Sequence, residues 1–344
     1  MQDLADEPIP HRVRRAGDGQ ALLPYLLATF GSADADELRT AITEGRIRLA
    51  DGAVLGAEDV VRFGQTLLAD MPGRVQSDPF LPTPLKPLPR LLLDDHLFVV
   101  DKPPGLLSYP MGPRRIAALS IGRRQLQCDA EALRPLHRLD LETSGALMMA
   151  RTLEADRAIK QAFQDRRVAK SYLALVRGRF PDGETVLGGA IGPDTGGPIR
   201  IAMRVHESGK PAETWVRNLG SFGETDHGSA GRGYTWVECH PRTGRTHQIR
   251  VHLAHHGHPL VGDKVYCDGG LAFLRKWDGK LDEQDQIRLE LPRHGLHAWS
   301  LALRHPADHR DLLITAPPAA DLVAFAREHG GDEPGPATPL AVPS

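Results

Sequence analysis

The chain has 344 residues, a formal net charge of −2 at pH 7, 41% hydrophobic residues and 25% charged residues, an ordinary balance for a soluble globular protein with one large and one small domain. No apolar run reaches the about 20 residues needed to cross a bilayer, and the acidic N-terminus lacks the layout of a signal peptide, so we expect a cytoplasmic protein. Three scattered cysteines without zinc-knuckle spacing argue against a disulfide framework and predict reduced thiols.

A small α/β module is predicted over residues 20–75, after an N-terminal extension at 1–19. Apolar residues at helical spacing between positions 22 and 30 predict one helix, and Leu38, Ile42 and Ile47 predict a second short helix and turn. The next residues predict a strand that ends in a hairpin turn at Asp51-Gly52.

A proline-rich stretch follows this module. Five prolines between residues 79 and 89 remove backbone donors and favour an extended chain, so we predict a linker over residues 76–90. A large domain is expected over residues 91–320. Because the end of the chain is rich in Gly and Pro and short of apolar residues, residues 321–344 are predicted to form a disordered tail.

Strands outnumber helices in the predicted large domain. Apolar or alternating segments predict strands over residues 96–101, 146–150, 170–178 and 236–239. Helices are predicted over residues 152–166, capped by Thr152, and over residues 247–256, capped by Thr246 and ended by Gly257. The helices do not alternate regularly with the strands, so the sequence predicts an α+β fold rather than a doubly wound sheet.

The segment His137–Leu147 places one carboxylate, Asp140, between a basic dipeptide and a small-residue turn. An acid flanked by His137 and Arg138 has its ionised form favoured, because opposite charges lower its pKa. That suits a nucleophile or an electrostatic stabiliser better than a proton donor. Considered by itself, Asp140 is equally consistent with a capping residue in a turn.

Five segments of the large domain together resemble the RluA-type pseudouridine synthases, enzymes that isomerise uridine within RNA. They occur in the order typical of that family, and chance motif matches rarely produce such a set. The segments are Leu97–Gly105, His137–Leu147, Lys170–Val176, Thr243–Leu253 with Gly257–Asp263, and Leu296–Pro306. The resemblance implies a pseudouridine synthase fold, with a mixed, largely antiparallel sheet, flanking helices and a central cleft. It also implies an isomerase that needs neither cofactor nor metal.

The resemblance implies catalytic roles for three residues. Asp140 matches the aspartate that acts at the anomeric carbon while the glycosidic bond breaks, after which the freed uracil turns and is rejoined through a ring carbon. Covalent capture of the sugar and removal of a sugar proton both remain open for this aspartate. Tyr172 matches the tyrosine that stacks on the target base, and its hydroxyl is a candidate for assisting removal of the ring-carbon proton. Arg250 matches the basic residue that pairs with the aspartate.

Further residues of these segments are expected to contact RNA. Arg138 is implicated by the resemblance in flipping the target base, with a phosphate contact or a loop brace as alternatives. Arg245 is a rival partner for Asp140, but a phosphate contact is the role we expect. His137, Lys170 and His247 complete the predicted RNA contacts, and His137 is expected to orient its loop by hydrogen bonding.

The distribution of charge agrees with an RNA partner more than the net charge does. Residues 134–179 hold ten Lys or Arg against five Asp or Glu, a local net of +5, whereas residues 1–70 hold seven against twelve, a net of −5. Positive charge thus gathers around the predicted chemistry. The N-terminal module resembles a small RNA-binding module found in many family members, although a structural appendage fits its acidity equally well. We expect ribosomal RNA rather than transfer RNA as substrate, and a monomer.

Three other functions remain as alternatives. An inactive RNA-binding protein on the same scaffold would have no use for the three catalytic matches. A glycosidase would usually need two working carboxylates, and Glu142 is the nearest second candidate. His252 and His256 share a helix face at a spacing that permits two metal ligands, but no partner carboxylate at a familiar spacing accompanies them, so no metal site is predicted.

Overall fold

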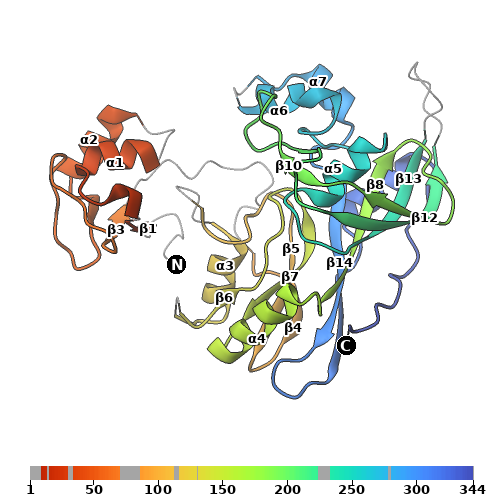
Figure 1. The fold of residues 1–344 in the computed structure, drawn as a ribbon, viewed down its shortest axis with the longest axis horizontal. Helices are drawn as coiled ribbons and strands as arrows, with labels where there is room; N and C mark the ends of the chain where they lie inside the picture. The colour runs from red at the N-terminus through yellow and green to blue at the C-terminus, as the bar shows by residue number, and fades with distance from the viewer. Residues whose placement is uncertain are drawn as a thin grey trace.

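The computed structural model describes residues 9–13, 15–29, 34–69, 86–111, 116–129, 131–223, 233–277 and 280–343. Figure 1 shows a small N-terminal unit beside a larger domain built on one extended sheet. None of the helices in these ranges combines the length and apolarity required to span a membrane.

The N-terminal unit is a three-stranded antiparallel sheet with two helices. The strand order is β1 (Ile9–Arg12), β3 (Thr66–Ala69), β2 (Ile47–Leu49), and the helices are α1 (Leu22–Thr29) and α2 (Ala35–Thr43). Its hydrophobic core consists entirely of residues between 13 and 69, so the unit packs on itself.

The two helices predicted for this unit are confirmed. The predicted Asp51-Gly52 turn is present, but β2 pairs with β3 rather than with a strand directly after the turn, where a single bridge joins Arg48 to Val54.

Ten strands of the described large domain form one sheet. Their order is β4-β5-β7-β14-β8-β13-β12-β9, with β15 beside β14 and β6 beside β7. All pairings are antiparallel except a short parallel contact between β7 and β14. The strands are β4 (Arg90–Leu93), β5 (Leu97–Lys102), β6 (Arg134–Pro135), β7 (Ser144–Ala150), β8 (Ala169–Arg177), β9 (Glu184–Gly188), β12 (Glu213–Phe222), β13 (Tyr234–Pro241), β14 (Leu296–Arg304) and β15 (Asp311–Thr315). The predicted α+β class with a largely antiparallel sheet is therefore confirmed, as are the four predicted strands.

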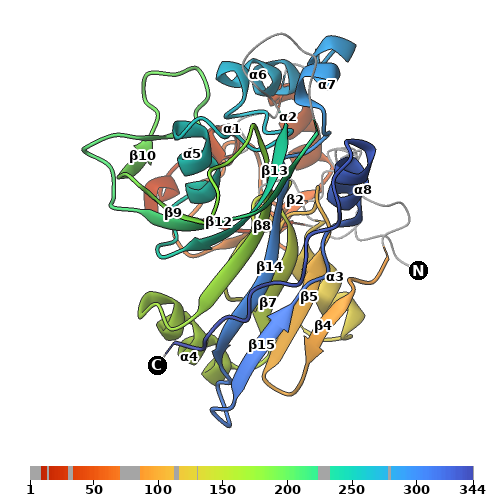
Figure 2. The ribbon, with the colours of Figure 1, turned by 90° about the vertical axis from the view of Figure 1, so that its right-hand side faces the viewer.

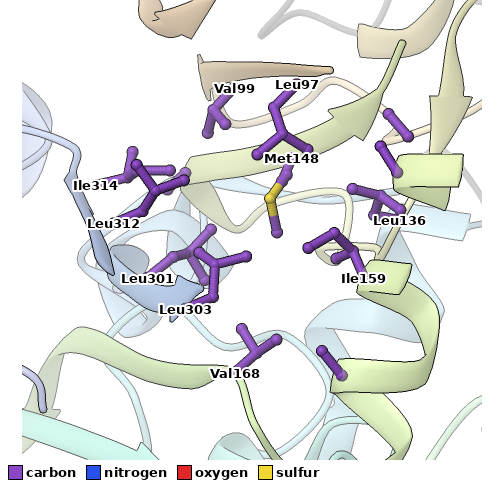
Figure 3. Packing of buried hydrophobic residues seen from close by; sticks show 14 of the residues in the cluster. Leu97, Val99, Leu136, Met148, Ile159, Val168, Leu301, Leu303, Leu312 and Ile314 are labelled. Atoms are coloured by element: carbon purple, nitrogen blue, oxygen red, sulfur yellow. The ribbon is translucent and has the colours of Figure 1, made fainter. Parts of the chain in front are cut away.

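Helices cover both faces of this sheet. Alternate strand residues point to opposite faces, so in β5 Val99 packs with α4 (Leu153–Gln164), whereas Phe98 packs with α3 (Ala118–Gln125). Figure 3 shows the first of these cores, where Ile159 of α4 lies near Met148 of β7. In the same way α5 (Gln248–His255) and α8 (Ala320–Glu328) pack on opposite faces of β8 and β13.

The remaining described elements are a 3₁₀ turn (Arg15–Gly17), the hairpin β10 (Ile191–Pro193) with β11 (Met203–Val205), a 3₁₀ turn (Asp268–Gly270), α6 (Leu271–Trp277) and α7 (Glu283–Leu289).

The two predicted helix caps have different outcomes. Thr152 caps α4 as expected, since its side chain accepts a hydrogen bond from the Ala155 amide. The predicted cap of α5 by Thr246 is wrong, because the helix begins one residue later and His247 occupies the cap with a φ of 55°. The Gln248 side chain accepts from the Arg245 amide at 3.0 Å and so holds the loop before the helix, and no side chain caps the first turn of α5.

The prediction of a disordered tail over residues 321–344 is wrong for the residues that the structure describes. Residues up to 328 continue α8, and the following segment runs along the sheet (Figure 2). Trp236 donates its indole N–H to the Asp332 carbonyl at 3.1 Å, and the Thr338 hydroxyl donates to the buried Glu238 carboxylate. Buried polar groups on β13 thus find their partners in the tail, a constraint that composition does not reveal.

Candidate active site

The Asp140 loop joins β6 to β7 and is held on both sides by buried polar groups. Ser108 exchanges two hydrogen bonds with the backbone of Leu139, accepting from its amide at 2.9 Å and donating to its carbonyl at 3.0 Å. The buried Lys102 ammonium donates to the Leu141 carbonyl at 3.3 Å, and the Thr143 amide closes the turn on the Asp140 carbonyl. These contacts fix the backbone on which Asp140 is presented.

Asp140 lies in a pocket of about 110 Å³ between its own loop, β8, the loop after β13 and the start of α5. This pocket brings together seven of the eight residues predicted from the sequence: Asp140, Tyr172, Arg250, Arg138, Lys170, Arg245 and His247. The eighth, His137, does not line it. Residues far apart in the sequence thus converge on one concave site.

Arg250 joins two carboxylates. Its Nη1 donates to Asp140 Oδ2 at 2.9 Å, while Nε and Nη2 donate to Asp263 Oδ2 and Oδ1 at 2.7 and 2.9 Å. Asp263 also accepts from the amides of Val265 and Tyr266. Because Asp263 is fully buried and bidentate, it fixes the guanidinium, which in turn aims Asp140.

Electrostatics keep the Asp140 carboxyl ionised. Burial by itself would raise its pKa, but the Arg250 guanidinium, with a smaller contribution from Arg138, holds the pKa below its usual value. The Asp140 side chain is 24% exposed, and its Oδ1 accepts no hydrogen bond from any described residue. The site therefore offers one charged, aimed oxygen to a substrate.

Tyr172 faces the same pocket from β8. Burial and then the Asp140 carboxylate raise the pKa of its phenol, so it remains neutral. Within the described ranges its hydroxyl has no hydrogen-bond partner. An aromatic ring in this setting provides a stacking surface with a free polar edge.

His247 lies behind Asp140, with Nε2 3.7 Å from Asp140 Oδ2. Its Nδ1 is 2.7 Å from the hydroxyl of Tyr266, which accepts from the Met203 amide, and the Tyr266 ring lies 5.0 Å from the Arg250 guanidinium carbon. Burial and then Arg250 lower the pKa of His247 to about 4, so the ring is neutral at physiological pH. His247 thus supports the carboxylate rather than presenting a cation to RNA.

Sequence reasoning assigned no role to Asp263 or Tyr266. Asp263 is the last residue of a matched segment, so its place in that segment could have marked it as a site residue. Tyr266 lies outside every matched segment, so the sequence gave no indication of its role. Its position depends on a turn that follows Asp263, which only the fold reveals.

The predicted RNA-contacting arginines lie at the pocket wall. Arg138 is exposed, with Nη1 3.5 Å from the Tyr109 hydroxyl and its guanidinium carbon 5.9 Å from the ring centroid. Arg245 donates from Nε to the Pro211 carbonyl at 3.1 Å. Asp140 is therefore paired with Arg250, and the rival pairing with Arg245 is not formed.

His137 supports the loop from behind. Its Nε2 accepts from the Met148 amide at 3.0 Å, and its ring lies 5.4 Å from that of Phe163. Burial, followed by the nearby Lys170 ammonium, lowers the pKa of His137 to about 3. The position agrees with the loop-orienting role rather than with direct contact in the pocket.

The residues behind the alternative functions have other partners. Glu142 accepts from the ammonium groups of Lys264 and Lys276 and does not line the pocket, so it does not supply a second carboxylate there. His252 pairs its two ring nitrogens with Thr214 Oγ1 and the Gly189 carbonyl at 2.9 and 3.1 Å. Over the described parts of the chain, no three His, Cys, Asp or Glu side chains gather as metal ligands would.

Comparisons with known proteins converge on one family. Residues 96–255 match the family described as RNA pseudouridylate synthase. The chain is 33% identical to ribosomal large subunit pseudouridine synthase D of Xanthomonas campestris pv. campestris, with 94% of each chain covered. It is 35% identical to the Nitrosomonas europaea protein of that name, covering 80% of this chain and 74% of the other. Among solved structures, human RNA pseudouridylate synthase domain containing 1 matches with a TM-score of 0.53 and 28% identity, covering 69% of this chain and 87% of that one.

Proposed function

The chain belongs to the RluA-type family of RNA pseudouridine synthases, isomerases that act on RNA, and on this basis we propose that it converts uridine to pseudouridine in large-subunit ribosomal RNA. The observation that carries the proposal is the aimed, ionised Asp140 beside Tyr172 in one pocket. The named substrates of the similar bacterial proteins support the choice of ribosomal RNA.

In the proposed reaction Asp140 is the nucleophile. The bond between C1′ of the ribose and N1 of uracil breaks, its electron pair leaves with the base, and the Asp140 carboxylate adds to C1′. The uracil turns against the Tyr172 ring, and its C5 then attacks C1′ and releases the carboxylate. C5 loses its proton and N1 takes one up, so the product is an isomer of the substrate. Arg250 holds the carboxylate in line throughout.

Access to a uridine in folded RNA requires the base to leave its stack, at a cost of a few kcal/mol. We propose that Arg138 fills the vacated space. It is exposed at the pocket mouth, two residues before Asp140, and rests on Tyr109 by a weak contact that is easily given up. Stacking of the displaced base on Tyr172 would offset part of the cost.

The main test is replacement of Asp140 by Asn. We expect turnover to fall by about 10⁴-fold or more, the scale of loss when an enzyme loses a catalytic group, while RNA affinity changes little. The measurement is a transcriptome-wide pseudouridine map, by chemical labelling and primer extension, of RNA treated with wild-type or variant protein. The control is Asp165→Asn, an exposed carboxylate at the end of α4.

Each result of this map has a clear meaning. A uridine in large-subunit ribosomal RNA that is modified by wild-type and Asp165→Asn protein but not by Asp140→Asn supports the proposal. Modification confined to transfer or messenger RNA would support the proposed reaction but would show that ribosomal RNA is not the substrate. Undiminished modification by the Asp140→Asn protein would overturn the role of the carboxylate.

We also propose that the N-terminal unit is an RNA-binding module joined by a linker to the catalytic domain. The predicted bounds of 20–75 for the module, 76–90 for the linker and 91–320 for the catalytic domain are too narrow or shifted, because β1 (Ile9–Arg12) pairs within the unit, Leu88 is buried in the core of the large domain, and α8 extends that domain to Glu328. The module has its own core, so it is separable from that domain. Deleting residues 1–75 is expected to weaken RNA binding about tenfold or more, because two linked binding units reinforce each other. The turnover rate at saturating RNA should stay the same. Filter binding and single-turnover rates check this; unchanged affinity would mean a structural appendage.

A further inference from the structure

Lys170 is half-buried, and its surroundings differ from those of Lys102 and Lys264, the two buried lysines of the described chain. It precedes Tyr172 by two residues on β8, and its ammonium reaches the pocket wall, where Nζ would lie 3.9 Å from a Cβ added at Gly244. Lys102 donates to three backbone carbonyls, and Lys264 donates to Glu142 and to a carbonyl. Their charges are compensated within the protein.

No such compensation exists for Lys170. Among the described residues its ammonium has no hydrogen bond and no carboxylate within ion-pair distance, and its nearest recorded partner is the Phe163 ring, 5.9 Å away. Burial lowers its pKa, and no acidic group opposes that effect. Asp140, the one carboxylate among the pocket-lining residues, is bound to Arg250. The half-buried Lys170 ammonium thus stands at the pocket wall without a counter-charge from the described chain, and an anion that enters the pocket can pair with it.

We propose that Lys170 binds a phosphodiester group flanking the target uridine and thereby fixes the register of the RNA in the pocket. This inference rests on the proposed function, since it takes RNA as the substrate. A lysine acts as a point charge for phosphate. The start of α5 lines the same pocket and adds the positive end of its dipole there.

The placement of Lys170 relative to Tyr172 favours a phosphate over the uracil base. Residues two apart on a strand share a face and lie about 6.6 Å apart. If the Tyr172 ring stacks on the base, Lys170 lies beside the base rather than over it, where the backbone of the same nucleotide runs. The full charge of a phosphate also attracts the half-buried ammonium more strongly than the neutral carbonyl of a base does.

The first test measures RNA binding against salt with a uridine-containing RNA hairpin as probe. Lys170→Met keeps the length of the side chain and removes its charge. We expect binding about tenfold to a hundredfold weaker and a salt slope reduced by about 0.7 to 0.9, the contribution of one phosphate contact. Lys170→Arg should retain the slope. The matched control is Lys160→Met, whose ammonium pairs with Asp156 on the outer side of α4.

The second test removes the phosphate charge. Methylphosphonate linkages are placed 5′ or 3′ of the target uridine in the ribosomal stem-loop that the wild-type protein modifies. At one of the two positions, the methylphosphonate should weaken RNA binding by wild type and by Lys160→Met. Lys170→Met, which already lacks the contact, should bind the methylphosphonate RNA and the unmodified RNA equally well. Equal losses in all three proteins at both positions, or an unchanged salt slope, would overturn the proposal.

The two proposals can fail separately. The hairpin experiment needs no turnover, so a reduced salt slope for Lys170→Met would support the phosphate contact even if no ribosomal uridine were modified. Conversely, a ribosomal substrate combined with an unchanged slope would sustain the proposed function and reject Lys170 as the phosphate ligand. Thermal unfolding of Lys170→Met checks that a loss of binding is not a loss of folding.

Discussion

Asp263→Asn should nearly abolish turnover and strongly destabilise the protein, although Asp263 does not line the pocket. The substitution leaves the buried Arg250 guanidinium without the carboxylate that holds its Nε and Nη2. Removing one partner of a buried ion pair typically costs about 3–5 kcal/mol. The freed guanidinium would also turn toward Asp140 and bind it with both nitrogens, drawing the nucleophile away from the sugar. Urea unfolding and single-turnover rates measure the two effects.

The neighbouring Asp268 provides the matched control. It is an exposed acid five residues further along the same segment, and Asp268→Asn should change neither stability nor rate appreciably. If Asp263→Asn kept both the wild-type rate and the wild-type stability, Asp140 would be aimed by its own loop and not through Arg250.

Local patterns predicted the strands because the period of apolar residues is a local property. Residues 146–150 are apolar on both faces, and β7 is buried along its whole length. The Asp140–Arg250 pair is different in kind: its members lie 110 residues apart, and no spacing rule connects them. The resemblance to a known family supplied that pair. The fold then added Asp263, an acid at the end of a matched segment, and Tyr266, which no local signal had marked.

The wrong predictions of the disordered tail and of the α5 cap have different physical origins. A Gly- and Pro-rich tail is expected to stay disordered when it has nothing to bind, but β13 carries Trp236 and the buried Glu238, whose polar groups need partners. The predicted α5 cap failed because His247 adopts a left-handed φ of 55° and the helix starts after it, with no side chain capping its first turn. The Gln248 side chain accepts from the Thr243 hydroxyl and the Arg245 amide and so holds the loop before the helix.

Mild acid is expected to destabilise the protein well above the pKa of its carboxylates. Burial lowers the pKa of His137 to about 3 and those of His247 and His297 to about 4. The unfolded chain binds protons at these rings below their ordinary pKa of about 6.5, whereas the folded protein does not until about pH 4. Their contribution to stability is therefore complete above pH 6.5 and is lost as the pH falls toward 4.

Burial also lowers the pKa of His294 well below its ordinary value. These four histidines together should lower the free energy of unfolding by about 5 kcal/mol between pH 7 and pH 5.5, since each contributes about 1.2 kcal/mol over that interval as the unfolded chain takes up protons. Urea unfolding at pH 7.0, 6.0 and 5.5 measures the loss. In His137→Gln the amide oxygen can accept from the Met148 amide without titrating, so the loss should shrink by about a quarter, whereas substituting the exposed His255 should leave it unchanged. A free energy of unfolding that stayed constant down to pH 5 would mean that these rings take up protons in the folded state, and that the loop behind Asp140 tolerates a charge there.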